Sequence, residues 1–310
     1  MFIVFYFSME KIALLIIYNH RFDRNIPVLE NLMKDKWTYI FHIVPFYDGD
    51  KENVIPVYEN SYYYQGYIAQ AYQTLKKYDF DHFVIIGDDM VLNPKLNERN
   101  ILTELGLQST DSYFPIIKDL KKGKWDNIDY AACFRLIQKG AEVYRVLPSK
   151  EEAEKLFEKH GYKGKMQIST ATAIKNLIGC HICDVRSFVN LLLKIIKHPF
   201  GRIEFEYPFV GGISDFFIID KASMSKFCHY CGAFAAANLF IEVAVPTSLL
   251  LTCSKVVTET KDSPYKELYL WDNDIITFAK KYDYKYCDMI KDFPEDRLFV
   301  HPIKLSKWIL

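Results

Sequence analysis

The chain has 310 residues, of which 50% are hydrophobic and 25% charged, and its 39 basic residues balance its 39 acidic ones. This composition excludes a disordered, collagen-like or coiled-coil protein. The lack of a basic excess disfavours a nucleic acid as the main partner. No stretch reaches the roughly 18 to 20 uninterrupted apolar residues that a membrane-spanning helix needs.

The seven Cys show no disulfide pattern of a secreted protein, which favours a location in the reducing cytoplasm. Residues 1–8 precede a second Met, and we expect them to be an upstream start or a surface appendage.

The first ninety residues alternate between apolar runs and helical patterns. Continuous apolar runs, typical of strands buried on both faces, lie at 11–18, 39–46 and 82–86. Helical patterns separate them, at 25–34 and 62–77. This alternation predicts right-handed βαβ crossovers and a parallel sheet.

Polar groups follow each of the three expected strands. They are Tyr18-Asn19-His20, Asp48 and Asp88-Asp89. Ligands of parallel sheets bind at the carboxyl ends of the strands, so we expect these groups to converge on one cleft.

The rest of the chain predicts more helices and two further strands. The capping box Ser149-x-x-Glu152 begins a helix that continues to about Lys159. Further helices are expected at 188–196, 222–237 and 241–251, where Pro246 fits poorly, and strands at 215–220 and 298–300. There is no repeat and no linker, which favours one domain with a large insertion over two domains.

Asp88 and Asp89 directly follow the third apolar strand. Two adjacent carboxylates repel each other and are costly to desolvate unless a cation or hydrogen-bond donors compensate. Mg²⁺ and Mn²⁺ favour one or two carboxylates together with phosphate oxygens, so a metal that bridges a diphosphate would supply this compensation. The alternative is an ordinary turn, in which Asp is common.

Two cysteine pairs raise the question of zinc. Cys180-x-x-Cys183 and Cys228-x-x-Cys231 supply four thiols, but 44 residues separate the pairs, against roughly 15 to 20 in zinc ribbons. Both pairs lie in apolar, helical surroundings, where Cys packs as a small hydrophobic residue. We therefore expect no zinc site here.

The segment from Phe83 to Pro94 (FVIIGDDMVLNP) resembles the strand and acidic "DxD" segment of GT-A fold, nucleotide-sugar-dependent glycosyltransferases. The resemblance covers about residues 10–95 well and 211–304 weakly. It implies an α/β fold with a mixed, mostly parallel central sheet flanked by helices. It also implies that Tyr18, Asn19 and Asp48 contact the base and ribose of the donor. Gly87 stands where the first acidic residue of the motif commonly lies, which makes Asp89 the metal ligand and Asp88 a ribose contact or a support for that ligand.

The C-terminal segment His301-Pro-Ile-Lys304 also resembles part of several GT-A enzymes. The resemblance implies that His301 is a further metal ligand and that Lys304 contacts the donor diphosphate. Imidazole suits Mn²⁺, and the Lys ammonium is a point charge that binds phosphate. The same resemblance divides a single catalytic domain over residues 1–310 into three parts. These are a nucleotide-binding half at about 10–95, an inserted helical region at about 97–200, and an acceptor-side half at about 201–310.

Transfer with inversion requires a general base that accepts the proton of the acceptor hydroxyl. Glu242 is a lone carboxylate in an apolar segment, FIEVAVP, that would raise its pKa toward a useful value. Asp215, which follows Gly211-Gly212, is the second candidate and resembles a substrate-binding acid of the fold. The alternative for each is a buried carboxylate satisfied by backbone donors or Arg.

Together these patterns predict a metal-dependent glycosyltransferase that uses Mn²⁺ or Mg²⁺ and a nucleoside-diphosphate sugar, with UDP the expected nucleotide. The resemblance implies a glycan or lipid-linked acceptor in bacterial capsule or lipopolysaccharide synthesis, and a cytoplasmic enzyme that works free or at the inner face of the membrane. A nucleotidyltransferase is the alternative enzyme, although residues 19–25 contain no Gly for a phosphate loop. A non-catalytic glycan-binding protein of the same fold is the other alternative.

Overall fold

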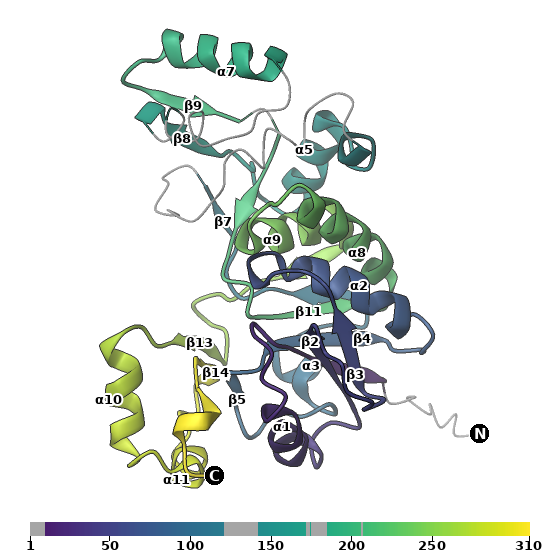
Figure 1. The fold of residues 1–310 in the computed structure, drawn as a ribbon, viewed down its shortest axis with the longest axis vertical. Helices are drawn as coiled ribbons and strands as arrows, with labels where there is room; N and C mark the ends of the chain where they lie inside the picture. Colours follow the sequence, from purple (N-terminus) through teal and green to yellow (C-terminus); the bar gives the residue numbers. More distant parts are fainter. Residues whose placement is uncertain (1–9, 121–141, 172–173, 175–184, 206) are drawn as a thin grey trace, which may run out of the picture.

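The computed structural model describes residues 10–120, 142–171, 174, 185–205 and 207–310. Within them, a seven-stranded sheet with the order β12-β6-β11-β4-β1-β2-β3 forms the centre of the molecule (Figure 1). Six of these strands run in one direction, and β11 is antiparallel to both of its neighbours. The expected mixed, mostly parallel sheet flanked by helices is therefore confirmed. The strands are β1 (Ile12–Ile17), β2 (Tyr39–Pro45), β3 (Val54–Val57), β4 (His82–Gly87), β6 (Asp111–Tyr113), β11 (Phe216–Asp220) and β12 (Lys255–Val257).

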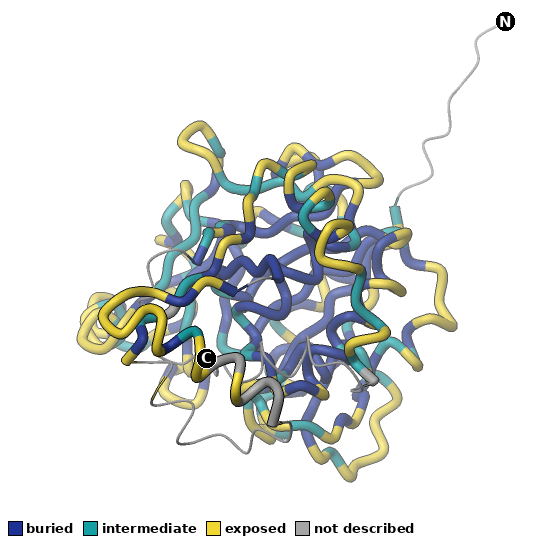
Figure 2. The backbone as a smooth tube through the Cα atoms, turned by 90° about the horizontal axis from the view of Figure 1, so that it is seen from above, coloured by how far each residue is buried: buried dark blue, intermediate teal, exposed yellow. Residues whose placement is uncertain are grey.

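Both faces of the sheet are covered, and Figure 2 shows the buried centre as a continuous dark region. On β1, Leu15 and Ile17 pack into one hydrophobic cluster and Leu14 and Ile16 into the other. This is why the strands read as continuous apolar runs: alternate side chains point to opposite faces, and each face is buried.

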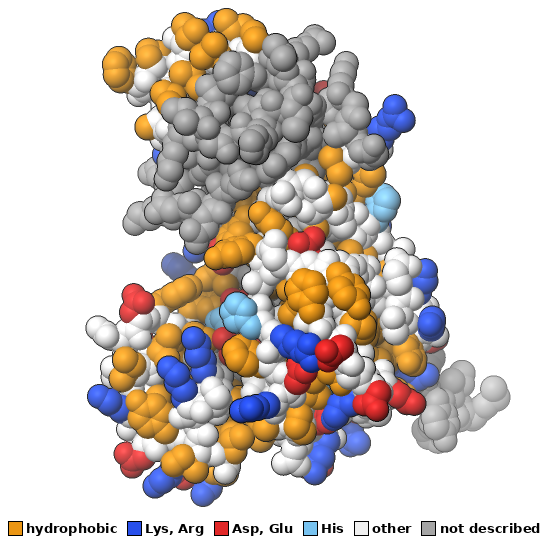
Figure 3. All heavy atoms as spheres, in the orientation of Figure 1, with side chains coloured by type: hydrophobic (Ala, Val, Ile, Leu, Met, Phe, Trp, Pro, Cys, Tyr) orange, Lys and Arg blue, Asp and Glu red, His pale blue; other side chains and the backbone are white. Residues whose placement is uncertain are grey.

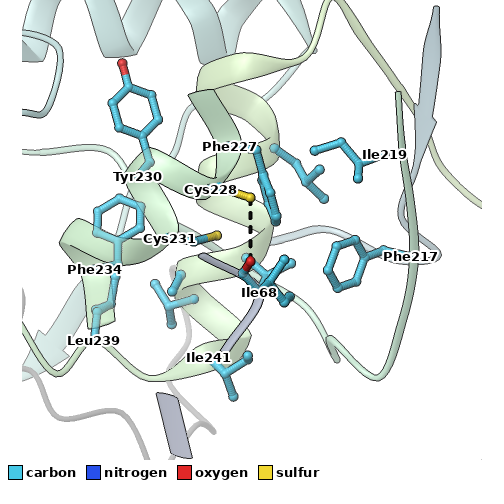
Figure 4. Packing of buried hydrophobic residues seen from close by; sticks show 14 of the residues in the cluster. Ile68, Phe217, Ile219, Phe227, Cys228, Tyr230, Cys231, Phe234, Leu239 and Ile241 are labelled. Carbon is cyan, nitrogen blue, oxygen red and sulfur yellow. Dashed lines mark hydrogen bonds between the residues drawn. The ribbon is translucent and has the colours of Figure 1, made fainter. Parts of the chain in front are cut away.

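Three helices cover the first face: α2 (Gln65–Leu75), α8 (Lys221–Ala236) and α9 (Ile241–Thr252). Figure 4 shows Cys228 and Cys231 of α8 among the apolar side chains of this layer. The Cys228 thiol lies 3.9 Å from the Ile68 carbonyl, and the Cys231 thiol lies 3.6 Å from the Ser248 hydroxyl. Burial raises the pKa of Cys228 well above its ordinary value, which disfavours a metal-binding thiolate. The other pair, Cys180 and Cys183, lies outside the described residues.

The opposite face is covered by α1 (Asn25–Met33), by α3 (Ile101–Glu104) and by the C-terminal part of the chain. That part contains α10 (Asn273–Lys281), α11 (Tyr286–Lys291) and the short helix η3 (Leu305–Lys307). It also forms a three-stranded sheet with the order β13-β14-β5, from β13 (Lys266–Tyr269), β14 (Arg297–His301) and β5 (Val91–Leu92). This small sheet attaches the end of the chain to the segment that follows β4.

The region between β6 and β11 extends away from the central sheet (Figure 1). Its capping box is confirmed: the Ser149 hydroxyl accepts from the Glu152 amide, and the Glu152 carboxylate accepts from the Ser149 amide. The described elements of this region are β7 (Lys118–Asp119), η2 (Glu142–Arg145), α5 (Lys150–Lys159), β8 (Gln167–Ser169), α7 (Val185–Lys197), β9 (Arg202–Glu204) and β10 (Val210–Gly211).

Outside this region, a short helix, η1 (Ser61–Tyr63), precedes α2.

Among the described helices, none combines the length and the apolar character needed to cross a membrane.

Candidate functional site

The acidic pair Asp88 and Asp89 lies at the carboxyl end of β4, in the middle of the central sheet. Strand β11 runs antiparallel to β4, so the residue that enters β11, Asp215, comes to this same edge. The Gly87 amide donates to the Asp215 carbonyl at 3.1 Å, which fixes the two segments side by side. The sheet topology therefore joins two acidic segments that are far apart in sequence.

Asp88 points into the protein, and only 6% of its surface is exposed. Its carboxylate accepts from the Asn25 side chain at 3.1 Å and from the backbone amide of Asn19. Burial and the neighbouring charge of Asp89 raise the pKa of Asp88 to about 7. Asp88 thus ties the loop after β1 and the start of α1 to the end of β4.

Asp89 and His301 face each other across the site. Asp89 Oδ1 and His301 Nδ1 lie 3.2 Å apart, and both atoms are buried with no hydrogen-bond partner besides each other. Two ligands at right angles on an octahedral ion, each about 2.1 Å from it, lie about 3 Å apart. The observed separation therefore fits one divalent cation bound by both side chains.

The backbone explains why His301 reaches Asp89. β5 begins two residues after Asp89 and pairs with β14 in antiparallel register, Val91 opposite Val300. The Ile303 amide donates to the Asp89 carbonyl at 2.5 Å. His301, at the end of β14, is therefore held against Asp89 from both sides.

Asp215 contacts the other imidazole nitrogen of the same histidine. His301 Nε2 lies 3.4 Å from Asp215 Oδ2. With the proton on Nε2 directed at Asp215, the lone pair of Nδ1 faces Asp89, which is the tautomer that a metal ligand needs. Burial opposes a charge on His301, but Asp89 and Asp215 outweigh it and raise the pKa of the imidazole. The site therefore favours a positive charge between these carboxylates, whether a proton or a metal ion supplies it.

Glu242 lies in the first turn of α9, close enough to Asp215 for their charges to interact. Burial, and next the charge of Asp215, raise the pKa of Glu242 to about 7. At neutral pH this carboxyl group exchanges its proton readily, as a general base must.

The misfit of Pro246 in α9 has a structural consequence at Glu242. Pro246 has no amide hydrogen, so the Glu242 carbonyl, four residues earlier, receives no helical hydrogen bond from it. The Gly212 amide donates to this carbonyl instead, at 2.9 Å. A Cβ on Gly212 would lie 2.4 Å from the Ile116 carbonyl, so only glycine fits there. The bond ties the helix that carries Glu242 to the loop that carries Asp215.

The four expected nucleotide contacts outside the acidic segment differ in their surroundings. Asn19 is half-buried, and its backbone amide bonds to Asp88. Asp48 is exposed and pairs with Arg21, which lowers the pKa of Asp48 and joins the loops after β2 and β1. Lys304 is also exposed, three residues after His301. Tyr18 is fully buried and its hydroxyl bonds to His42 at 2.9 Å, so its side chain has no surface for a nucleotide. Tyr18 directly follows Ile17, the last residue of β1, and is buried like the strand; the sequence analysis did not consider this role.

Two tyrosines that the sequence analysis did not single out border the site. The Tyr64 hydroxyl is buried and donates to the Ser214 carbonyl at 2.5 Å, directly before Asp215. The ring of Tyr269 meets the His301 ring edge to face at 5.8 Å, and its buried hydroxyl has no hydrogen-bond partner. Nothing in the sequence distinguishes them from the other members of a set of 22 tyrosines.

Within the described residues, no three His, Cys, Asp or Glu side chains are arranged as a complete metal-binding group. Asp89 and His301 could supply two ligands, and a cation held by this pair would take its remaining ligands from water or substrate oxygens. Comparison of the chain with protein-family models, with curated proteins and with solved structures gives no match.

Proposed function

We propose that the protein is a metal-dependent glycosyltransferase of GT-A type that transfers a sugar from a nucleoside-diphosphate sugar. The observation that carries the proposal is the buried pair Asp89 Oδ1 and His301 Nδ1, 3.2 Å apart and with no hydrogen-bond partner besides each other. It lies at the carboxyl ends of parallel strands, where sheets of this kind bind their ligands. Two ligands with no third protein ligand among the described residues suit a metal that also binds diphosphate oxygens.

In the proposed reaction, an acceptor hydroxyl oxygen attacks the anomeric carbon of the donor as the bond to the diphosphate oxygen breaks. Glu242 accepts the hydroxyl proton, and the diphosphate leaves with the bond electrons. A divalent cation, when bound, supplies positive charge beside the leaving diphosphate. For Asp215, the second candidate for the base, we propose instead that its 3.4 Å contact positions His301, with no direct step in the transfer.

The first experiment measures UDP binding by isothermal titration calorimetry with and without Mn²⁺, in the wild type and in Asp89→Asn. We expect the wild type to bind UDP at least about tenfold more tightly with Mn²⁺. The Asp89→Asn change should remove this difference, because an amide is a poor ligand for a hard cation. Asp220→Asn is the matched control, since Asp220 lies at the other end of β11, where its side chain caps α8.

Asp220→Asn should leave the Mn²⁺ effect on UDP binding intact. Equal Mn²⁺ effects in the wild type and in the Asp89 variant contradict the metal assignment. Mn²⁺-dependent UDP binding without sugar transfer to any acceptor would favour a binding protein of this fold, and release of diphosphate from a nucleoside triphosphate would favour a nucleotidyltransferase.

A further inference from the structure

Helix α7 carries a stripe of exposed apolar side chains: Val189, Leu192, Leu193 and Ile196. These residues are three or four positions apart, so they share one face of the helix. Ile196 is 63% exposed. Figure 1 shows α7 at the end of the molecule opposite the C-terminus, and Figure 3 shows hydrophobic atoms gathered there.

The stripe is not the face by which α7 packs onto the protein. Ile195 is buried and belongs to the same hydrophobic cluster as Ile203 of β9. Ile195 follows Leu192 by three positions, so this contact borders the stripe, whose four side chains stay exposed. Phe200 extends the exposed surface beyond the helix, and its side chain is fully exposed. Exposed apolar side chains gathered on one face of a helix mark an interaction site.

The charges around the stripe favour an anionic partner. Residues 189–203 contain Lys194, Lys197 and Arg202 and no acidic residue, and Glu204 follows them. Lys197 is exposed and directly follows Ile196, at the edge of the stripe. An apolar face bordered by Lys and Arg is typical of helices that lie in the interface of an anionic bilayer. A second copy of this chain would bring the same positive charges together, which opposes pairing of two such helices.

We propose that α7 and Phe200 dock the protein on an anionic phospholipid surface, with the helix in the plane of the membrane. The apolar stripe enters the boundary between headgroups and acyl chains, and Lys197 lies at the level of the lipid phosphates. This inference does not rest on sugar transfer, because the helix, the stripe and the charges are independent of the Asp89 site. Docking would give the protein access to acceptors carried on lipid.

The test is flotation of the full chain with phosphatidylcholine vesicles, with and without phosphatidylglycerol at about one part in three. We expect the wild type to float with the anionic vesicles only, and less at high salt, which screens the lysines. The double variant Leu192→Glu with Ile196→Glu should lower the partition coefficient at least about tenfold, because two charges replace two inserted apolar groups. Lys197→Glu should lower it at least about fivefold.

Ile276→Glu on α10 is the matched control, since Ile276 is also an exposed helical isoleucine. It should float like the wild type. The melting temperature of every variant is measured. If the double variant does not fold, the partition coefficient of Lys197→Glu and the salt dependence of flotation test the proposal instead. The proposal is overturned if the wild type does not float, if it floats equally with neutral vesicles, or if the double variant floats unchanged. A wild-type dimer that the double variant dissociates, without flotation, also overturns it in favour of a second copy.

Discussion

We expect the substitution Glu242→Gln to lower the transfer rate and to raise the stability of the protein above neutral pH. Glutamine keeps the size of the side chain and resembles the protonated acid, but it cannot accept a proton. If Glu242 is the general base, the transfer rate should fall by roughly 10² to 10⁴-fold. Donor binding should stay near that of the wild type, because the change removes no predicted donor contact.

The stability effect follows from the pKa of Glu242, which burial and Asp215 raise from 4.5 to about 7. The folded protein therefore retains a proton that the unfolded chain releases between these two pH values. The free energy of unfolding falls as pH rises through this window, and the loss is complete above pH 7. The loss amounts to at most about 3 kcal/mol, because the side chain keeps some contact with water, which screens its charge. Glutamine carries no such penalty, so the variant should be more stable than the wild type at about pH 8 and equal to it at about pH 4.

The assay combines transfer rates at saturating donor and Mn²⁺ with urea denaturation at about pH 4 and about pH 8. Glu267→Gln is the matched control: burial and the charge of Glu259 raise the pKa of Glu267 to about 7 as well. It should gain stability at the higher pH and keep its turnover. Full turnover in Glu242→Gln, or a loss of stability at the higher pH with unchanged turnover per folded molecule, would refute the assignment of Glu242 as the base.

Two further predictions test the edges of the site. Asp48→Ala should weaken donor binding roughly tenfold, because a charged hydrogen bond contributes roughly 1.5 kcal/mol; a donor dissociation constant within about twofold of the wild type by calorimetry would show that Asp48 does not contact the donor. Gly212→Ala should lower the free energy of unfolding by about 1 to 3 kcal/mol, since the new methyl group overlaps the Ile116 carbonyl and the Phe114 ring. Urea denaturation measures this, and a variant as stable as the wild type would mean that the loop at Gly212 rearranges freely.

The strands that position the acidic pair were predictable because burial on both faces leaves a strong pattern. β1 is a continuous apolar run of six residues, and the six residues of β4, HFVIIG, are all buried. The observed ends of both strands lie within one residue of the expected ones. β6 has the sequence DSY and β12 the sequence KVV. Runs of three residues with polar members carry no periodicity, and only pairing with β11 and with each other makes them strands.

The candidate site was predictable in its members and less so in their contacts. The resemblance to GT-A enzymes suggested Asp89 and His301, and the structure brings these two residues together. The contact of Asp215 with His301 depends on the antiparallel entry of β11 beside β4, which no local pattern specifies. The sequence does not decide the role of Tyr18, because a tyrosine at the end of an apolar run can be either a buried strand residue or a ligand contact.

The joining of β5 to β14 has a consequence for synthesis of the chain. His301 follows Asp89 by 212 residues. A ribosome encloses the most recently added residues, so β14 cannot pair with β5 until this part of the chain has left it. A nascent chain can thus form β1, β2 and β4 early and still lack the nitrogen that faces Asp89. The proposed two-ligand site at the acidic end of β4 would be complete only once β14 is free to fold, and metal binding there would wait until the rest of the sheet has been made.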